Sequence, residues 1–208
     1  MSSNYYTKTL LGVFDTSSDK SWKRYENEKG FLKFISPIDG KDFSSGGADV
    51  YIRNLSFYND VELIQVRSID EFGEPVFHFF LKYDSQYAQL KGSSDTIHEV
   101  NAESEICITI DTVFDYLKFF SLFTVNDDGD AFYIVEGQDS EFIRDLSAYE
   151  KSRHLRKFNG SVVEDAQEMG VYKISTRVLC AGALYDCRFD VTSDGDVQMV
   201  DDHSVGSV

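Results

Sequence analysis

Alternation of apolar and polar side chains predicts that much of this chain is β-strand. Between Ala183 and Thr192 the odd positions are apolar, and three of the even positions between them are charged. Side chains along a strand point alternately to its two sides, so this segment should have one face toward a core and one toward water. Further strands are expected over Leu10–Phe14, Phe31–Ile35, Val50–Phe57, Val61–Ile69, Val76–Tyr83, Glu105–Ile110, Ala131–Glu136, Val171–Cys180 and Asp196–Asp201.

The first hairpin can be given a register from the apolar residues that it brings opposite each other. A three-residue connection, residues 58–60, would place Phe57 opposite Val61, whereas a two-residue connection would place Phe57 opposite Glu62. We expect the three-residue connection because it places apolar side chains opposite each other. The same register pairs Leu55 with Leu63 and Ile52 with Val66.

The last hairpin has its own register signal in the turn Ser193–Gly195. With Gly195 left-handed in a bulge, Val191 faces Val197 and Phe189 faces Met199. A plain two-residue Asp-Gly turn would instead place Val191 opposite Gln198. The sequence therefore predicts the bulged turn.

Two segments change from the strand period to the helix period. Over residues 112–124, Thr112 and Asp115 have the spacing of a capping box, and apolar residues recur at helical intervals on nearly every face. Over residues 140–158, acids lie at the beginning and bases at the end, which suits the helix dipole. One face of this second helix should carry Phe142, Ile143, Leu146 and Tyr149.

These elements predict an α+β fold: a hairpin-rich, mainly antiparallel sheet of about eight or nine strands, with two principal helices packed on it. Only two prolines occur and the glycines are scattered, so no linker divides the chain. We expect a single domain over residues 1–208, in which residues 1–30 are the part that packs most loosely.

Composition narrows the compartment and the kinds of partner. The chain has 208 residues, of which 42% are hydrophobic, and a net charge of −16. Such an acidic chain should not bind DNA, RNA or an anionic membrane by simple electrostatics. The N-terminus has no signal-peptide pattern, and Val113–Val125 is too short and too polar to cross a membrane. We expect a cytoplasmic protein.

The cysteines give no sign of a disulfide framework or a zinc site. Their number is odd, no C-x-x-C occurs, and Cys107 and Cys187 lie within apolar strand patterns. We expect both to be core side chains, and we expect no cofactor.

Local motifs for catalysis are missing, and only weak combinations of residues remain. The phosphate-loop, dinucleotide, nucleophile-elbow and zincin spacings do not occur. His78 lies between aromatic residues, and His98 is close in sequence to Glu99, Glu103 and Glu105, within a segment that reads as a polar loop. Residues 126–130 resemble a calcium loop in composition but lack its spacing, so a polar hairpin or a helix-to-strand loop is favoured.

Charge is distributed unevenly along the chain. Residues 1–60 are neutral overall, whereas residues 95–141 hold 12 acidic residues and a single basic one, Lys118. This band could serve solubility alone, or it could dock a basic protein. The candidate docking residues are Asp95, Glu99, Glu103, Glu105, Asp127, Asp128, Asp130, Asp139 and Glu141.

A basic group follows the acidic band. It could meet the acidic band of a second copy and so form a homo-oligomer. Its members are Lys151, Arg153, Arg156 and Lys157.

Two functions follow from these features. The first is a non-enzymatic protein-interaction module: an adaptor, an inhibitor or an immunity-like protein for a basic partner. The alternative is an enzyme or small-ligand binder whose site assembles around His78 or His98 with nearby carboxylates.

Overall fold

The computed structural model describes residues 21–39, 48–70, 72–126, 128–156, 158–165 and 170–207. The chain forms two compact units: a first unit that includes Asp60–Leu90 and the chain up to Leu55, and a second unit made of Ser56–Asn59 and Lys91–Val208. The described residues contain ten strands in two antiparallel sheets and four α-helices. The predicted α+β class is therefore confirmed.

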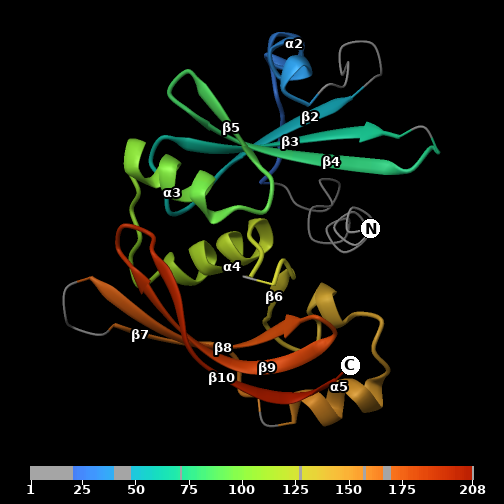
Figure 1. The fold of residues 1–208 in the computed structure, drawn as a ribbon, viewed down its shortest axis with the longest axis vertical. Coiled ribbons are helices and arrows are strands. Elements are labelled where there is room, and N and C mark those ends of the chain that lie inside the picture. Colours follow the sequence, from blue (N-terminus) through green and yellow to red (C-terminus); the bar gives the residue numbers. More distant parts are fainter. Residues whose placement is uncertain are drawn as a thin grey trace. The chain divides into compact units, whose positions relative to one another are not determined.

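The first unit is a five-stranded antiparallel sheet in which neighbours in sequence are neighbours in space (Figure 1). Each strand pairs with the next one along the chain. Short connections join β2 to β5 in order, as is common between antiparallel strands, whereas helix α2 lies between β1 and β2. Its strands are β1 (Lys23–Arg24), β2 (Asp49–Asn54), β3 (Val61–Ile69), β4 (Pro75–Tyr83) and β5 (Gln86–Leu90).

Helix α2 (Glu28–Asp39) covers one face of this sheet. The strand predicted over Phe31–Ile35 is therefore wrong, because these residues belong to the helix. Phe31, Leu32 and Ile35 are buried while Phe34 is exposed, which is the pattern of a helix face. A short apolar run does not distinguish a strand from a buried helix. Packing decides here, because these side chains join the core of Val50, Ile64, Val66 and Phe80.

The β2–β3 register differs from the predicted one by two residues. Ile52 lies opposite Ile64, not Val66, because the connection is longer than three residues: β2 ends at Asn54, which faces Glu62. A shift of two positions keeps every side chain on the same face of the sheet. The predicted pairs are therefore wrong, and the adjacent residues Leu63 and Ile64 are both buried, so the two faces of β3 each bear core side chains.

The second unit contains the other sheet, in the order β10-β9-β8-β6, with β7 also pairing with β8. Two of its strands, β8 and β9, have the predicted bounds. The strands are β6 (Phe132–Val135), β7 (Val162–Asp165), β8 (Val171–Cys180), β9 (Ala183–Thr192) and β10 (Val197–Ser207).

The β9–β10 turn is the bulged turn that the sequence predicts. Val191 pairs with Val197 and Phe189 with Met199, and Gly195 has φ +88°. The Thr192 N–H donates to the Asp196 carbonyl at 2.9 Å, and the Gly195 N–H donates to the Thr192 carbonyl at 3.0 Å. Cys187, Phe189 and Val191 are buried as the alternation along β9 predicts. Leu184, expected on the face toward water, is instead buried in the core that includes Leu155.

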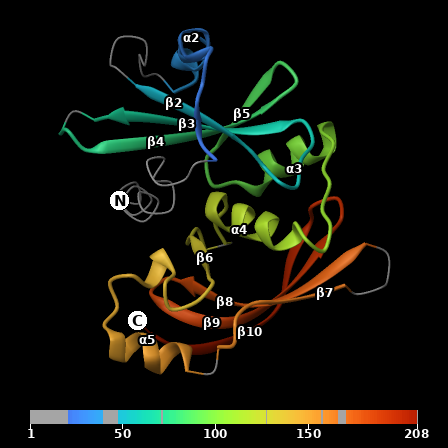
Figure 2. The ribbon, with the colours of Figure 1, turned by 180° about the vertical axis from the view of Figure 1, so that it is seen from behind.

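Helices α4 (Val113–Phe123) and α5 (Ala148–Leu155) lie on opposite faces of the second sheet (Figures 1 and 2). Eight of the eleven residues of α4 are buried, as its all-round apolar pattern predicts. The predicted capping box does not form, because Thr112 Oγ1 instead accepts from the Thr109 N–H at 2.9 Å. Within the described segments, no helix has both the length and the apolar character needed to cross a membrane.

The helix predicted over residues 140–158 is shorter than expected. A 3-10 turn (Glu141–Ile143) comes first, and α5 starts afresh after Ser147, which forms a capping box with Glu150. A new N-cap in the middle of an apolar pattern ends one helix and begins another. Tyr149, predicted on the buried face, is therefore 76% exposed, while Leu155 packs with Leu184 in the core.

The prediction of a strand over Glu105–Ile110 is also wrong, because the segment forms no strand. Only an isolated bridge joins Ile106 to Tyr58. Because the segment is not paired into a sheet, it has no regular face toward the core, and Cys107 is exposed. The prediction that this thiol is part of the core is therefore wrong. The prediction for Cys187, which is buried, is confirmed.

A buried polar network joins the elements of the second unit. Asn101, on helix α3 (Ser94–Glu103), accepts a hydrogen bond from the Tyr58 hydroxyl and donates to the Tyr116 hydroxyl at 2.8 Å. Tyr116 donates to the Gly195 carbonyl at 2.7 Å. Burial raises the pKa of Tyr116, which keeps its hydroxyl protonated as the donor.

Replacing Gly195 with alanine should destabilise the protein strongly. A Cβ at this position would have a disfavoured positive φ and would lie 2.6 Å from the Tyr116 hydroxyl and 2.9 Å from Ile106 Cδ1. We expect Gly195→Ala to lower the free energy of unfolding by about 2–4 kcal/mol. Urea unfolding followed by circular dichroism measures the change.

The matched control is Gly182→Ala. Gly182 also has a positive φ, +75°, but an added Cβ would meet nothing within 4 Å. Gly182→Ala should lower the free energy of unfolding only through the strain of a positive φ, by about 1–2 kcal/mol. Equal losses for the two variants would contradict the close approach at Gly195.

Candidate functional site

Helix α3 carries the most regular group of acidic side chains in the predicted band. Asp95, Glu99 and Glu103 follow each other at one-turn spacing, and all three are exposed. The opposite side of the helix is buried through Ile97, Val100 and Asn101. We call Asp95, Glu99 and Glu103 the carboxylate stripe.

The carboxylate stripe does not serve helix stability well. Like charges one turn apart destabilise a helix by about 0.2–0.5 kcal/mol per pair. Asp95 is favourably placed in the first turn, where Ser93 caps the helix, but Glu103 lies at the C-terminal end, where the helix dipole disfavours an anion. The helix itself carries no lysine or arginine that could offset these charges at helical spacing.

Lys118, the single basic residue of the acidic band, forms ion pairs with two carboxylates. Lys118 Nζ lies 3.0 Å from an Asp115 carboxylate oxygen and 3.2 Å from one of Glu136. Burial alone would lower the pKa of Lys118, but these two carboxylates hold that pKa above its ordinary value. Lys118 therefore pairs with carboxylates on α4 and just after β6, and its single charge offsets only part of theirs.

The other predicted acidic residues lie on separate connections. Glu105 follows α3 and accepts from the Asn59 side chain at 3.4 Å, while Glu141 accepts from Arg144 at 2.8 Å. All of them that the structure describes are exposed, and Asp127 lies outside the described residues. The structure thus unites Asp95, Glu99 and Glu103 on one helix, and leaves the following ones on loops and turns: Glu105, Asp128, Asp130, Asp139 and Glu141.

Asn126 organises the connection between α4 and β6 on either side of Asp127, which lies outside the described residues. Asn126 Oδ1 accepts from the N–H groups of Asp128 at 3.1 Å and Asp130 at 2.8 Å, and Gly129 has φ +82°. Within the described segments, no three His, Cys, Asp or Glu side chains converge as a metal site. These hydrogen bonds are those of an Asx turn, and the segment belongs to the connection from a helix to a strand, one of the two forms that the sequence favours.

The two histidines of the alternative hypothesis lie in different units. His78 is half-buried on β4 of the first unit, opposite Val66. His98 is half-buried on α3 of the second unit, with its ring centroid 5.9 Å from that of Phe120. The segment around His98 is a helix rather than the predicted loop, and Glu99 and Glu103 lie on its exposed side.

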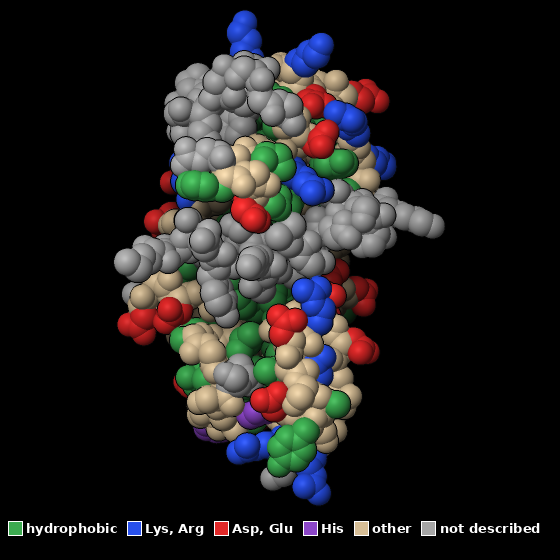
Figure 3. All heavy atoms as spheres, turned by 90° about the vertical axis from the view of Figure 1, so that its right-hand side faces the viewer, with side chains coloured by type: hydrophobic (Ala, Val, Ile, Leu, Met, Phe, Trp, Pro, Cys, Tyr) green, Lys and Arg blue, Asp and Glu red, His purple; other side chains and the backbone are tan. Residues whose placement is uncertain are grey.

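The predicted basic group lies at the end of α5. Arg153 and Arg156 are exposed and Lys151 is half-buried, while Lys157 lies outside the described residues. Lys and Arg side chains gather at the lower end of Figure 3, where α5 lies. A basic C-terminal turn suits the helix dipole whether or not it has a partner.

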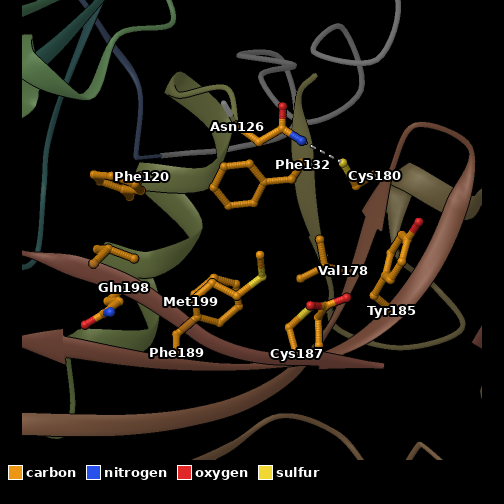
Figure 4. Close-up of a pocket in the computed structure, with 12 residues that line it drawn as sticks. Phe120, Asn126, Phe132, Val178, Cys180, Tyr185, Cys187, Phe189, Gln198 and Met199 are labelled. Atoms are coloured by element: carbon orange, nitrogen blue, oxygen red, sulfur yellow. Dashed lines mark hydrogen bonds between the residues drawn. The ribbon is translucent and has the colours of Figure 1, made fainter. Parts of the chain in front are cut away.

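The second unit also contains a pocket that the sequence did not reveal. It has a volume of about 570 Å³ and lies between α4 and the face of the second sheet that α4 covers. Figure 4 shows its walls, formed by aromatic side chains, thiols and Met199. Alternation along β9 predicts that Cys187 and Phe189 share a face, but it gives no sign that packing leaves space there. We call this cavity the thiol pocket.

The two thiols of the pocket are held in the protonated form. Cys180 Sγ accepts a hydrogen bond from the Asn126 side chain at 3.7 Å, and burial, then Asp130 and Asp128, raise its pKa. Burial, then Asp202 and Asp186, raise the pKa of Cys187 to about 12. Because the thiolate is the nucleophile, neither cysteine is activated for catalysis.

Comparison with known proteins adds no further evidence about this site. No protein-family model, curated protein or solved structure matches the chain.

The three cysteines should differ in their rates of alkylation. Cys107 is exposed, Cys180 is half-buried, and Cys187 is buried with a pKa about four units above pH 8. Timed reaction with N-ethylmaleimide at pH 8, read by mass spectrometry, should modify Cys107 first and Cys187 last. The rates should differ by at least about tenfold between these two. Reaction of Cys187 as fast as Cys107 would contradict its burial.

Proposed function

We propose that the protein acts through protein–protein contacts, with the carboxylate stripe of α3 as the docking surface for a basic partner. The observation that carries the proposal is the stripe itself: exposed carboxylates on successive turns of a helix whose other side is buried. A rigid row of negative charge speeds encounter with cationic surfaces and favours partners that present matching lysines and arginines.

The energetics of α3 support a role beyond folding. The stripe places two like-charged pairs one turn apart and an acid at the unfavourable end of the helix. Acids spread without order would keep the protein equally soluble at a lower cost to this helix. The competing explanation, solubility alone, makes no distinction between these three carboxylates and three others elsewhere on the surface.

The experiment compares two triple variants of equal charge. The stripe variant is Asp95→Asn, Glu99→Gln, Glu103→Gln, and the control is Glu26→Gln, Glu74→Gln, Asp84→Asn in the first unit, where all three residues are exposed. The probe is a fluorescein-labelled peptide of ten lysines, and binding is measured by fluorescence anisotropy in ~20 mM salt. Circular dichroism checks that both variants remain folded.

The stripe variant should bind the peptide about 5–30-fold more weakly than the unmodified protein, because each exposed ion pair contributes roughly 0.2–1 kcal/mol. The control variant should keep most of the affinity, and ~0.5 M salt should abolish binding to both. An equal loss of peptide affinity in the two variants would contradict the proposal, because the acidic residues would then act only through their overall charge and serve solubility.

A second copy of this chain is the competing partner. The basic end of α5 could meet the carboxylate stripe of another molecule. Light scattering of the protein alone at ~20 mM and ~0.5 M salt distinguishes a second copy from another basic protein. A protein that is monomeric at both salt concentrations supports the proposed partner. A low-salt oligomer that the stripe variant loses would replace the proposed partner with a second copy.

A further inference from the structure

We propose that the thiol pocket is a binding site for a small molecule with an apolar body and a protonated amine. This inference concerns a different surface from the carboxylate stripe and does not depend on the proposed docking function. It rests on the size of the pocket, its lining and the sign of the charges around it.

The size and lining of the pocket suit a small organic molecule. Its volume of about 570 Å³ lies within the ~300–1,000 Å³ typical of ligand sites. Phe120 from α4, Phe132 from β6 and Phe189 from β9 line the same space, together with Met199 (Figure 4). Such a surface favours an apolar or aromatic body through burial and ring contacts.

The charges at the pocket select the polar end of the ligand. Asp202 is the only charged side chain among the twelve described residues that line it, and it lies opposite Cys187 on the neighbouring strand. Asp128 and Asp130, in the turn that follows the lining residue Asn126, act electrostatically on Cys180. A cation is therefore favoured at this pocket and an anion such as a fatty acid is disfavoured.

Neutral polar groups complete the lining. The side chains of Asn126, Gln198 and Tyr185 also line the pocket, and each can form hydrogen bonds. They allow a ligand with an additional carbonyl or hydroxyl group, but they do not select its charge. The selection is left to the carboxylates.

The test uses two dyes that share a fluorophore and differ in the sign of their charge. Dansylcadaverine carries a protonated amine, and dansyl-aminocaproic acid carries a carboxylate on a chain of similar length. Fluorescence titration in ~0.15 M salt should show that the amine binds at least about tenfold more tightly than the acid. Equal affinity, or binding of neither dye, would overturn the proposal.

Protection of the thiols locates the bound dye. Cys180 lines the pocket and is half-buried, whereas Cys107 is exposed and lies outside the lining. Saturating dansylcadaverine should slow the reaction of Cys180 with N-ethylmaleimide at least about fivefold and leave Cys107 unchanged. Binding of the dye without protection of Cys180 would show that the amine binds elsewhere on the acidic surface.

A pair of neighbouring substitutions tests the electrostatic part. Asp202→Asn removes the charge that lines the pocket, and the tenfold preference for the amine should fall to less than about threefold. The control is Asp201→Asn, because Asp201 is absent from the lining and pairs with Arg188 at 2.6 Å. A similar loss of preference in both variants would overturn the role assigned to Asp202.

Discussion

The side-chain amide of Asn101 lies where α3, α4 and the β9–β10 turn meet, and the order of the second unit depends on its hydrogen bonds. An amide buried without partners would cost about 1–3 kcal/mol, so these elements must stay aligned to keep it satisfied. Tyr116 extends the network by donating to the Gly195 carbonyl. Only glycine fits at position 195, because a Cβ would lie too close to the Tyr116 hydroxyl. The network therefore fixes which side of α3 is buried.

The position of α3 determines what the surface can do. With Ile97, Val100 and Asn101 turned inward, the helix period leaves Asp95, Glu99 and Glu103 outward. The bulged β9–β10 turn likewise keeps Phe189 and Cys187 on the face that lines the thiol pocket. Packing of the second unit thus accounts for both sites that we propose. The docking surface is the side of α3 that the core leaves toward water, and the ligand site is a space within the packing that side chains leave unfilled.

Sequence reasoning succeeded where side chains have a period of two and a specific turn residue fixes the register. The bounds of β8 and β9 and the Gly195 bulge were predictable for this reason. It failed for Phe31–Ile35 and for α3, because a short apolar run and a polar segment take their structure from tertiary packing. The acidic residues could be found by counting charge, but the stripe needs the helix, and the pocket needs the packed sheet.

Hydrogen–deuterium exchange of an Asn101→Leu variant tests most directly whether this network holds α3 in place. Loss of the amide should speed exchange over residues 94–103 and 192–197 together by at least about tenfold, and leave α5 (Ala148–Leu155) unchanged. Far-UV circular dichroism checks that the variant is folded. Unchanged protection of α3 would show that its orientation, and with it the carboxylate stripe, does not depend on Asn101.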